Sequence, residues 1–217
     1  MTLYNRYSKR FPGLEYVLGA AVFSLGIFGA LTVSDQVSAF AVIISSVGFL
    51  QWIFSVGVSA NLKDVEFDTK LGITTTPVFF GVQAVGNQLK KPVLFIGYVY
   101  GLKLIHLLVV LLPFLLGYAS PLVFGYPIPL LGFFILSSIL LITTRGILIT
   151  PLDKRDQMLR YEGIHEGFAL LLIPFVLLSY LVEQLDIFAT SSLFLIMIAW
   201  PLLCLRLLYG KTLIPLE

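Results

Sequence analysis

Charged side chains are scarce in this sequence: they make up 12% of its 217 residues, whereas hydrophobic residues make up 58%. The net charge of +2 and the lack of a basic tract interleaved with aromatic residues argue against binding to nucleic acid. The single cysteine, Cys204, excludes a disulfide within the chain. No low-complexity segment, convincing internal repeat or soluble second domain is visible in the sequence. The composition therefore predicts a protein whose main solvent is lipid.

Six long apolar runs are present, and a helix needs about 20 such residues to cross a hydrocarbon core about 30 Å thick. They cover roughly residues 14–34, 38–60, 92–118, 126–148, 164–184 and 187–209. The first run is too long for a secretory signal and lacks an obvious cleavage site, so we interpret it as a retained span. Its glycines, Gly19, Gly26 and Gly29, favour close approach of neighbouring helices. We predict an all-α, polytopic transmembrane bundle of about six spans, forming a single domain over residues 1–217.

All of the 14 positively charged residues except Lys103 gather in four places along the chain, and the remaining connections between spans carry none. The four groups are Arg6, Lys9 and Arg10; Lys63, Lys70, Lys90 and Lys91; Arg145, Lys154, Arg155 and Arg160; and Arg206 and Lys211. Positive residues are retained on the cytoplasmic side of a membrane. We therefore predict that both termini lie in the cytoplasm, together with two loops at about residues 61–91 and 149–163.

The first of these loops opens with an unusually polar stretch, "NLKDVEFDTKLGITTTP", at residues 61–77. Asp64 and Asp68 are four residues apart, so they share one face, one turn apart, if the second helix continues through them. Their mutual repulsion calls for a positive partner, which Lys63 and Lys70 can supply as simple ion pairs. A Mg²⁺ ion shared with a diphosphate is the other interpretation, because Mg²⁺ takes one or two carboxylates and completes its shell with phosphate oxygens and water. The spacing alone leaves both interpretations open.

The string "DVEFDTKLGITTTPVFFG" resembles the second aspartate-rich motif of the UbiA-type membrane-embedded prenyltransferases, which reads approximately D-x-E-x-D-x-x-x-G-x-x-T-x-x-V. Upstream, "YSKRFPGLEYVLGAAVFSLGIFGAL" looks like the segment that enters the fifth helix of that family. Downstream, two spans, a basic loop and a further span follow the family's order. The resemblance covers most of the chain, and it is most distinctive over residues 7–30 and 61–81.

The resemblance implies Mg²⁺-dependent transfer of an isoprenyl group from an isoprenyl diphosphate to a hydrophobic acceptor at the membrane. Asp64 and Asp68 would be the catalytic residues and the metal ligands. The residues that would bind the diphosphate are Lys9, Arg10, Asn61, Lys63 and Lys70. Helices rich in Phe, Leu and Val would keep water away from the carbocation that forms when the diphosphate leaves.

The family's first aspartate-rich motif, N-D-x-x-D, does not occur in the sequence. The alignment implied by the resemblance starts this chain before the family's fifth helix, and the run at 187–209 is additional to the family's order. Three explanations stay open. The start is misplaced or the gene truncated, a second polypeptide supplies the N-terminal helices, or the chain is a derivative that has lost catalysis.

Two further groups of polar residues suggest alternatives. Lys103 and His106 lie three apart near the middle of the third run, where ionisable residues are a functional hypothesis by default; neighbouring carbonyl groups can also satisfy them. Glu162 and His165 follow the fourth run with no metal-ligand spacing, so we expect a solvated amphipathic loop there. The alternatives to an enzyme are a noncatalytic UbiA-like membrane subunit or lipid-binding scaffold, and a small transporter.

Overall fold

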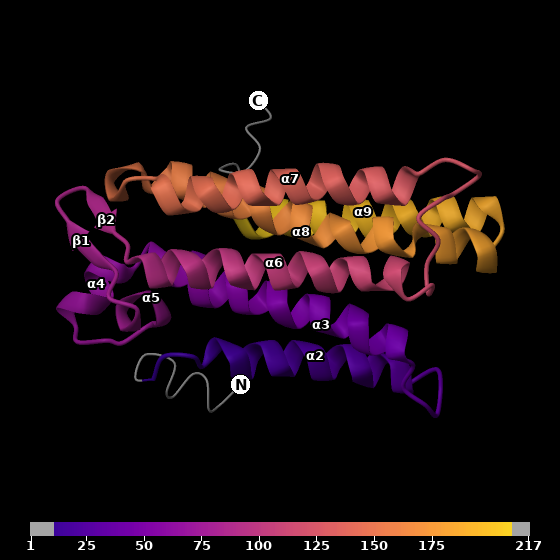
Figure 1. Cartoon of the computed structure of the whole chain (residues 1–217), viewed down its shortest axis with the longest axis horizontal. Helices are drawn as coiled ribbons and strands as arrows, with labels where there is room; N and C mark the ends of the chain where they lie inside the picture. The colour runs from indigo at the N-terminus through magenta and orange to yellow at the C-terminus, as the bar shows by residue number, and fades with distance from the viewer. Residues whose placement is uncertain (1–10, 210–217) are drawn as a thin grey trace. The chain divides into compact units, whose positions relative to one another are not determined.

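The computed structural model describes residues 11–209, apart from the side chains at positions 201, 204, 205, 208 and 209. All six predicted apolar runs form α-helices in it (Figure 1). They are α2 (Glu15–Leu31), α3 (Ala39–Ile53), α6 (Val93–Leu115), α7 (Ile128–Ile149), α8 (Arg155–Gln184) and α9 (Ile187–Tyr209). This confirms the predicted all-α helical bundle. Lys9, Arg10 and the side chain of Cys204 lie outside the described residues.

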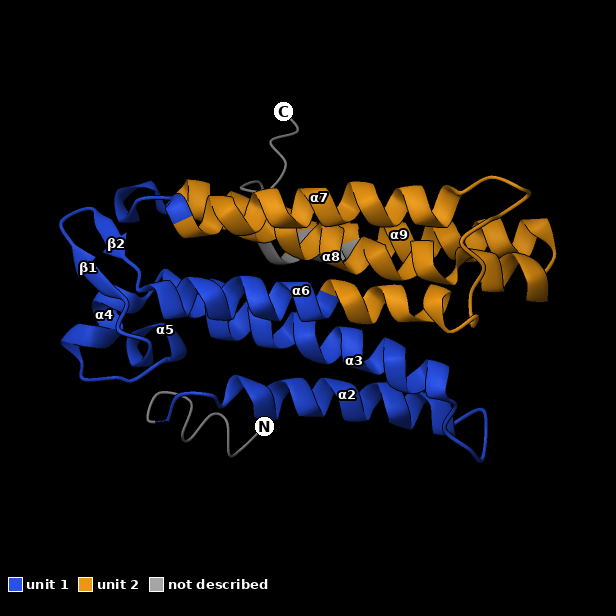
Figure 2. Ribbon diagram, viewed as in Figure 1, with its two compact units in different colours: residues 1–106, 149–155 blue, residues 107–148, 156–217 orange. Residues whose placement is uncertain are grey.

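The chain divides into two compact units (Figure 2). Unit 1 comprises residues 1–106 and 149–155, and unit 2 comprises residues 107–148 and 156–217. That the whole chain forms a single transmembrane domain stays a prediction.

Four helical segments are long and apolar enough to cross a membrane. They are Ala39–Ala60, Val93–Leu115, Ile128–Ile149 and Leu152–Gln184. The other two predicted spans, α2 and the Ile187–Trp200 part of α9, are shorter apolar helices. With 17 residues, α2 is roughly 25 Å long at 1.5 Å per residue, slightly less than the thickness of a hydrocarbon core.

The glycines of α2 that face α3 allow the two helices to approach closely. A Cβ atom at Gly19 would lie 3.0 Å from the ring of Phe49, and one at Gly26 would collide with the hydroxyl of Ser45. The packing interpretation is therefore confirmed for these two glycines. It is wrong for Gly29, where a Cβ would meet no described atom within 4 Å.

The connection between α3 and α6 contains several short elements. They are the π-helix η1 (Phe54–Ala60), α4 (Val65–Lys70), α5 (Thr76–Phe79) and a hairpin of β1 (Gln83–Val85) and β2 (Gln88–Lys90). The hairpin's register pairs Gln83 with Lys90 and Val85 with Gln88. Its turn residue Asn87 accepts a hydrogen bond from the N–H of Leu152 at 2.8 Å. The two connections predicted to be cytoplasmic therefore meet within unit 1, although no observation tests on which side of the membrane they lie.

The predicted loop at 149–163 is wrong in its extent, because α8 already begins at Arg155, directly after the 3₁₀ turn η2 (Leu152–Lys154). The expected solvated loop is also wrong, since Glu162 and His165 are buried. Nδ1 of His165 lies 3.0 Å from the hydroxyl oxygen of Thr143 on α7. Met158, Glu162 and His165 recur at the three- and four-residue spacing of one helix face. Hydropathy does not identify a buried helix face when that face carries polar residues.

Candidate functional site

The aspartate motif forms a short helix of its own. Helix α3 continues as the π-helix η1, and the chain then turns before α4, so the second helix does not continue through both aspartates. Asp64 is the N-cap residue of α4, and its N–H donates to the carbonyl of Asn61 at 3.2 Å. The N–H of Asp68 donates to the carbonyl of Asp64 at 2.8 Å. The two aspartates are thus still one helical turn apart, as the spacing predicts.

Helix α4 ends where the sequence places a glycine. Gly72 has φ +66°, a left-handed conformation that glycine adopts without steric cost. The N–H of Ile73 donates to the carbonyl of Asp68 at 2.8 Å, and the N–H of Gly72 donates to that of Thr69 at 3.2 Å. This is the hydrogen-bond pattern of a Schellman motif. Gly72 therefore terminates the helix and fixes the backbone immediately after Asp68.

The two aspartate side chains lie in different surroundings. Asp68 is buried, whereas the side chain of Asp64 is about one-third exposed. Oδ1 of Asp64 accepts a hydrogen bond from Nη2 of Arg155 at 3.2 Å. The sequence did not indicate Arg155 as a partner of Asp64, because the two residues are 91 positions apart and no local pattern connects them. The structure brings a cation to the exposed aspartate of the motif.

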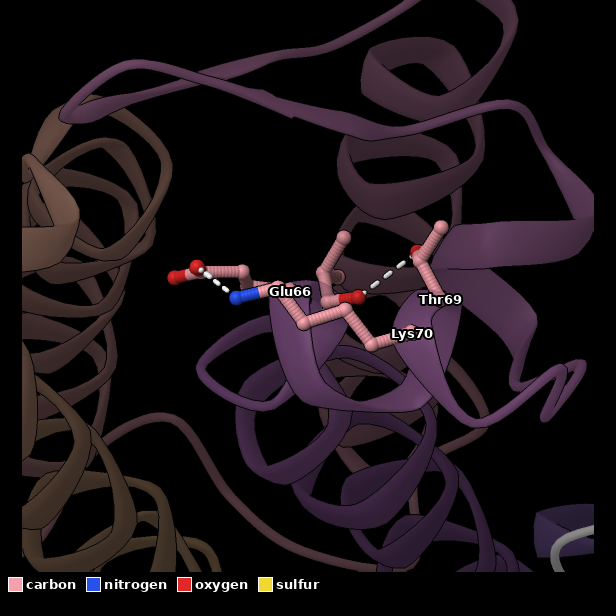
Figure 3. A network of polar contacts seen from close by, with 4 residues as sticks. Glu66, Thr69 and Lys70 are labelled. Carbon is pink, nitrogen blue, oxygen red and sulfur yellow. Dashed lines mark hydrogen bonds and ion pairs between the residues drawn. The ribbon is translucent and has the colours of Figure 1, made fainter.

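Lys70 pairs with the middle acidic residue of the motif, as Figure 3 shows. Its Nζ lies 2.6 Å from Oε1 of Glu66, and both side chains are more than half exposed. On the same helix, the hydroxyl of Thr69 donates to the carbonyl of Val65 at 2.7 Å. Lys63 lies half-buried in the turn just before Asp64. The structure thus keeps both lysines in the region of the motif, with Lys70 paired to Glu66 instead of to an aspartate.

Across residues 11–209, no group of three or more His, Cys, Asp or Glu side chains is arranged to hold a metal ion. The family resemblance assigns two of the motif's three carboxylates, those of Asp64 and Asp68, to a metal, and any further ligands would have to come from a substrate or from water. The predictions for Lys9 and Arg10 are not tested, since both precede the described residues.

The threonines that follow α4 turn inward. Thr75 and Thr76 are both buried. The hydroxyl of Thr76 donates a short hydrogen bond to Oε1 of Glu15, the first residue of α2, and Gly13 donates its N–H to the same hydroxyl at 3.3 Å. Glu15 is itself buried, with 4% of its surface exposed. These hydrogen bonds therefore connect the segment after the aspartate motif to the start of α2. In the sequence, the two segments resemble the family separately, and nothing indicates that they are in contact.

Lys103 and Gln51 form a buried polar contact inside unit 1. Nζ of Lys103 donates to Oε1 of Gln51 at 2.9 Å and lies 4.1 Å from the centre of the Phe54 ring. An amide oxygen and an aromatic face both stabilise a buried ammonium group. His106, one turn further along α6, is buried with no hydrogen-bond partner for either ring nitrogen among the described residues. A role in transport stays a prediction.

Lys91, at the end of the hairpin and outside the spans, is half-buried, and desolvation lowers the pKa of its ammonium group to about 8. About half of its side chains should therefore be neutral and nucleophilic at pH 8. We expect the rate of acylation of Lys91, followed by peptide mass spectrometry, to reach half of its plateau near pH 8. A short lysine peptide, whose pKa is about 10.4, is the reference. A rate that keeps rising tenfold per pH unit up to pH 10 would contradict the shift.

The helices define a polytopic, all-α membrane protein. The sequence model of the UbiA prenyltransferase family matches residues 1–147, a stretch that includes the whole aspartate motif. Because the match spans more than half of the 217 residues, the chain belongs to the UbiA prenyltransferase family. This confirms the resemblance seen in the motif. Neither the curated proteins nor the solved structures include one that matches the chain.

Proposed function

We propose that this protein transfers an isoprenyl group from an isoprenyl diphosphate to a hydrophobic acceptor within the membrane. The observation that carries the proposal is the aspartate motif on α4, which lies inside the region matched by the UbiA prenyltransferase family. The family membership supports the reaction class and the membrane setting. The acceptor, the chain length of the isoprenyl group and the need for a metal are part of the proposal.

The donor set of the motif fits Mg²⁺. Asp64 and Asp68 provide hard carboxylate oxygens one helical turn apart, and the described chain adds no third acidic or imidazole ligand to them. Mg²⁺ commonly binds one or two carboxylates and takes its other ligands from phosphate oxygens and water. Asp64 and Asp68 would hold the ion, which when bound supplies positive charge that stabilises the departing diphosphate.

Cationic side chains around the motif would bind the diphosphate directly. Arg155 already contacts Asp64, and its side chain is 61% exposed. Lys70 would have to leave Glu66, but an exposed ion pair contributes only about 0.2–1 kcal/mol, so the exchange costs little. The other residues that the family resemblance assigns to the diphosphate are Lys9, Arg10, Asn61 and Lys63. Arg155 joins this set because of its position beside Asp64.

In the proposed reaction the allylic C–O bond breaks, and its electron pair leaves with the diphosphate. A nucleophilic atom of the acceptor then forms a bond to the allylic carbon and loses a proton. Cationic groups aimed at the charge that develops on the leaving oxygen are usually the largest contribution to catalysis of such a step. The apolar helices contribute by keeping water from the allylic cation.

The test is an isoprenyl-transfer assay on the purified full chain in lipid nanodiscs. Geranyl, farnesyl and longer isoprenyl diphosphates are supplied with a panel of hydrophobic acceptors, with Mg²⁺ or with excess EDTA. We expect product only with Mg²⁺, a loss of at least 100-fold in EDTA, and recovery when Mg²⁺ is restored. Mg²⁺-dependent binding of the diphosphate without product would instead indicate a noncatalytic subunit. If the protein neither binds the isoprenyl diphosphate nor transfers its isoprenyl group, the proposal is refuted.

A further inference from the structure

A second polar site in unit 1 lies at the N-terminal end of α2, where the buried Glu15 meets the segment that follows the aspartate motif. It is a pocket of about 260 Å³. The residues that line this pocket include Glu15, Tyr16, Thr76, Phe79, Phe80 and Tyr98. The pocket thus combines one carboxylate with four aromatic rings.

The carboxylate is held in place by its neighbours. Oε1 of Glu15 accepts the hydrogen bond from Thr76, and the N-terminus of α2 favours a negative charge in its first turn. The π-helix η1 leaves room for the side chain at Gly57, where a Cβ would lie 2.7 Å from both Cγ and Oε1 of Glu15. The described lining of the pocket contains no Lys, Arg or His. Dipoles therefore stabilise this carboxylate, and a cationic ligand would complement it.

The aromatic side chains form a connected wall beside the carboxylate. The rings of Phe80 and Tyr98 stack with their centroids 4.9 Å apart, and Phe79 packs edge-on against Phe80. The hydroxyl oxygens of Tyr16 and Tyr98 lie 3.2 Å apart. Aromatic faces attract organic cations, and ammonium groups are recognised in pockets lined by several such rings. A carboxylate beside an aromatic wall therefore suits an ammonium group better than an anion.

A separate apolar cavity lies along the same helix, and its lining shares no residue with that of the pocket. It has a volume of about 590 Å³, and its lining begins at Val17, the residue after Tyr16. The residues that line this cavity include Val17, Leu18, Ala21, Leu25, Phe28 and Trp52. Because α2 is an apolar helix that begins at Glu15, we infer that the pocket faces the level of the lipid headgroups.

We propose that this site binds a membrane lipid whose headgroup carries an ammonium group, such as phosphatidylethanolamine or phosphatidylcholine. Glu15 and the aromatic wall receive the ammonium group of the lipid. An anionic lipid offers no cation to Glu15 and brings a negative charge toward a buried carboxylate. The site therefore selects lipids by headgroup.

The test measures lipid binding to the purified full chain by native mass spectrometry in a nonionic detergent, without isoprenyl diphosphate. Phosphatidylethanolamine, phosphatidylcholine and phosphatidylglycerol with the same acyl chains are titrated separately. We expect both ammonium lipids to bind at least tenfold more tightly than phosphatidylglycerol. Glu15→Gln, which keeps an oxygen to accept the Thr76 hydrogen bond but removes the charge, should abolish this preference. Glu183→Gln, at an exposed carboxylate in unit 2, should leave it unchanged.

Two further variants keep the test decisive if Glu15→Gln fails to fold. Phe79 is 64% exposed, so Phe79→Leu should fold normally and should weaken only the ammonium lipids, by three- to tenfold. Ala21→Trp fills the separate cavity along α2 and should leave the preference for ammonium lipids unchanged. Equal binding of phosphatidylglycerol, an unchanged preference in a folded Glu15→Gln protein, or equally tight binding of an uncharged isoprenyl alcohol would overturn the proposal. Because no transfer is measured, this outcome is independent of the proposed enzyme activity.

Discussion

We expect Asp68→Asn to lower the rate of the proposed isoprenyl transfer by roughly 10²–10³-fold, the loss that follows when a single group stabilising developing charge is removed from an active site. Asparagine has nearly the same shape as aspartate, but it cannot supply the negative oxygen that a Mg²⁺ ion prefers. Asp68 is buried near the middle of α4. The measurement is kcat/KM for the diphosphate in nanodiscs at saturating Mg²⁺.

Asp64→Asn should lower the transfer rate by a similar factor. This variant distinguishes a loss of catalysis from a loss of folding. Because Asp64 is partly exposed and its contact with Arg155 is at the surface, its replacement should hardly change stability. Asp156→Asn, at an exposed carboxylate in the first turn of α8, is the matched control and should retain full activity. Thermal unfolding of each variant is recorded alongside its activity. If Asp64→Asn and Asp68→Asn both transfer at the normal rate, the aspartates have no role in the reaction.

The helices could be predicted from the sequence because each depends on a property that is local in the chain. An apolar run long enough to cross a bilayer has few alternatives to a helix, since backbone groups in lipid must be satisfied within the segment. The ends of α7 and α9 agree with the predicted runs to within about two residues, which is the normal uncertainty of helix boundaries. Gly72 as the terminator of α4 was predictable for the same reason, because its left-handed backbone is a local requirement.

The contacts that build the candidate site could not be predicted, since each joins residues distant in sequence. Arg155 reaches Asp64 across 91 positions, and Thr76 reaches Glu15 across 61. The π-helix η1 was missed because hydropathy does not distinguish a π-helix from an α-helix. The spacing within the aspartate motif predicted that Asp64 and Asp68 lie one helical turn apart. It did not predict that one aspartate is buried and the other exposed.

Gly132→Ala should destabilise unit 2 by about 1–3 kcal/mol, because a Cβ at this position of α7 has no space. It would lie 2.7 Å from Cε1 and Cγ of Phe175 on α8, closer than real Cβ atoms approach. Phe175 cannot easily rotate away, since its ring also packs edge-on against Phe194 of α9, with centroids 5.5 Å apart. The expected result is a fall of roughly 3–10 °C in the apparent Tm of the protein in detergent.

Gly97→Ala on α6 is the matched control, since a Cβ there meets no described atom within 4 Å. Removing a glycine from a helix interior stabilises it by about 0.5–1 kcal/mol, so this variant should unfold at the same or a slightly higher temperature. Phe175→Leu combined with Gly132→Ala should recover part of the loss, because the smaller side chain vacates the space that the new methyl group needs. A double variant whose loss equals the sum of the two single losses would show that Gly132 and Phe175 are not in contact.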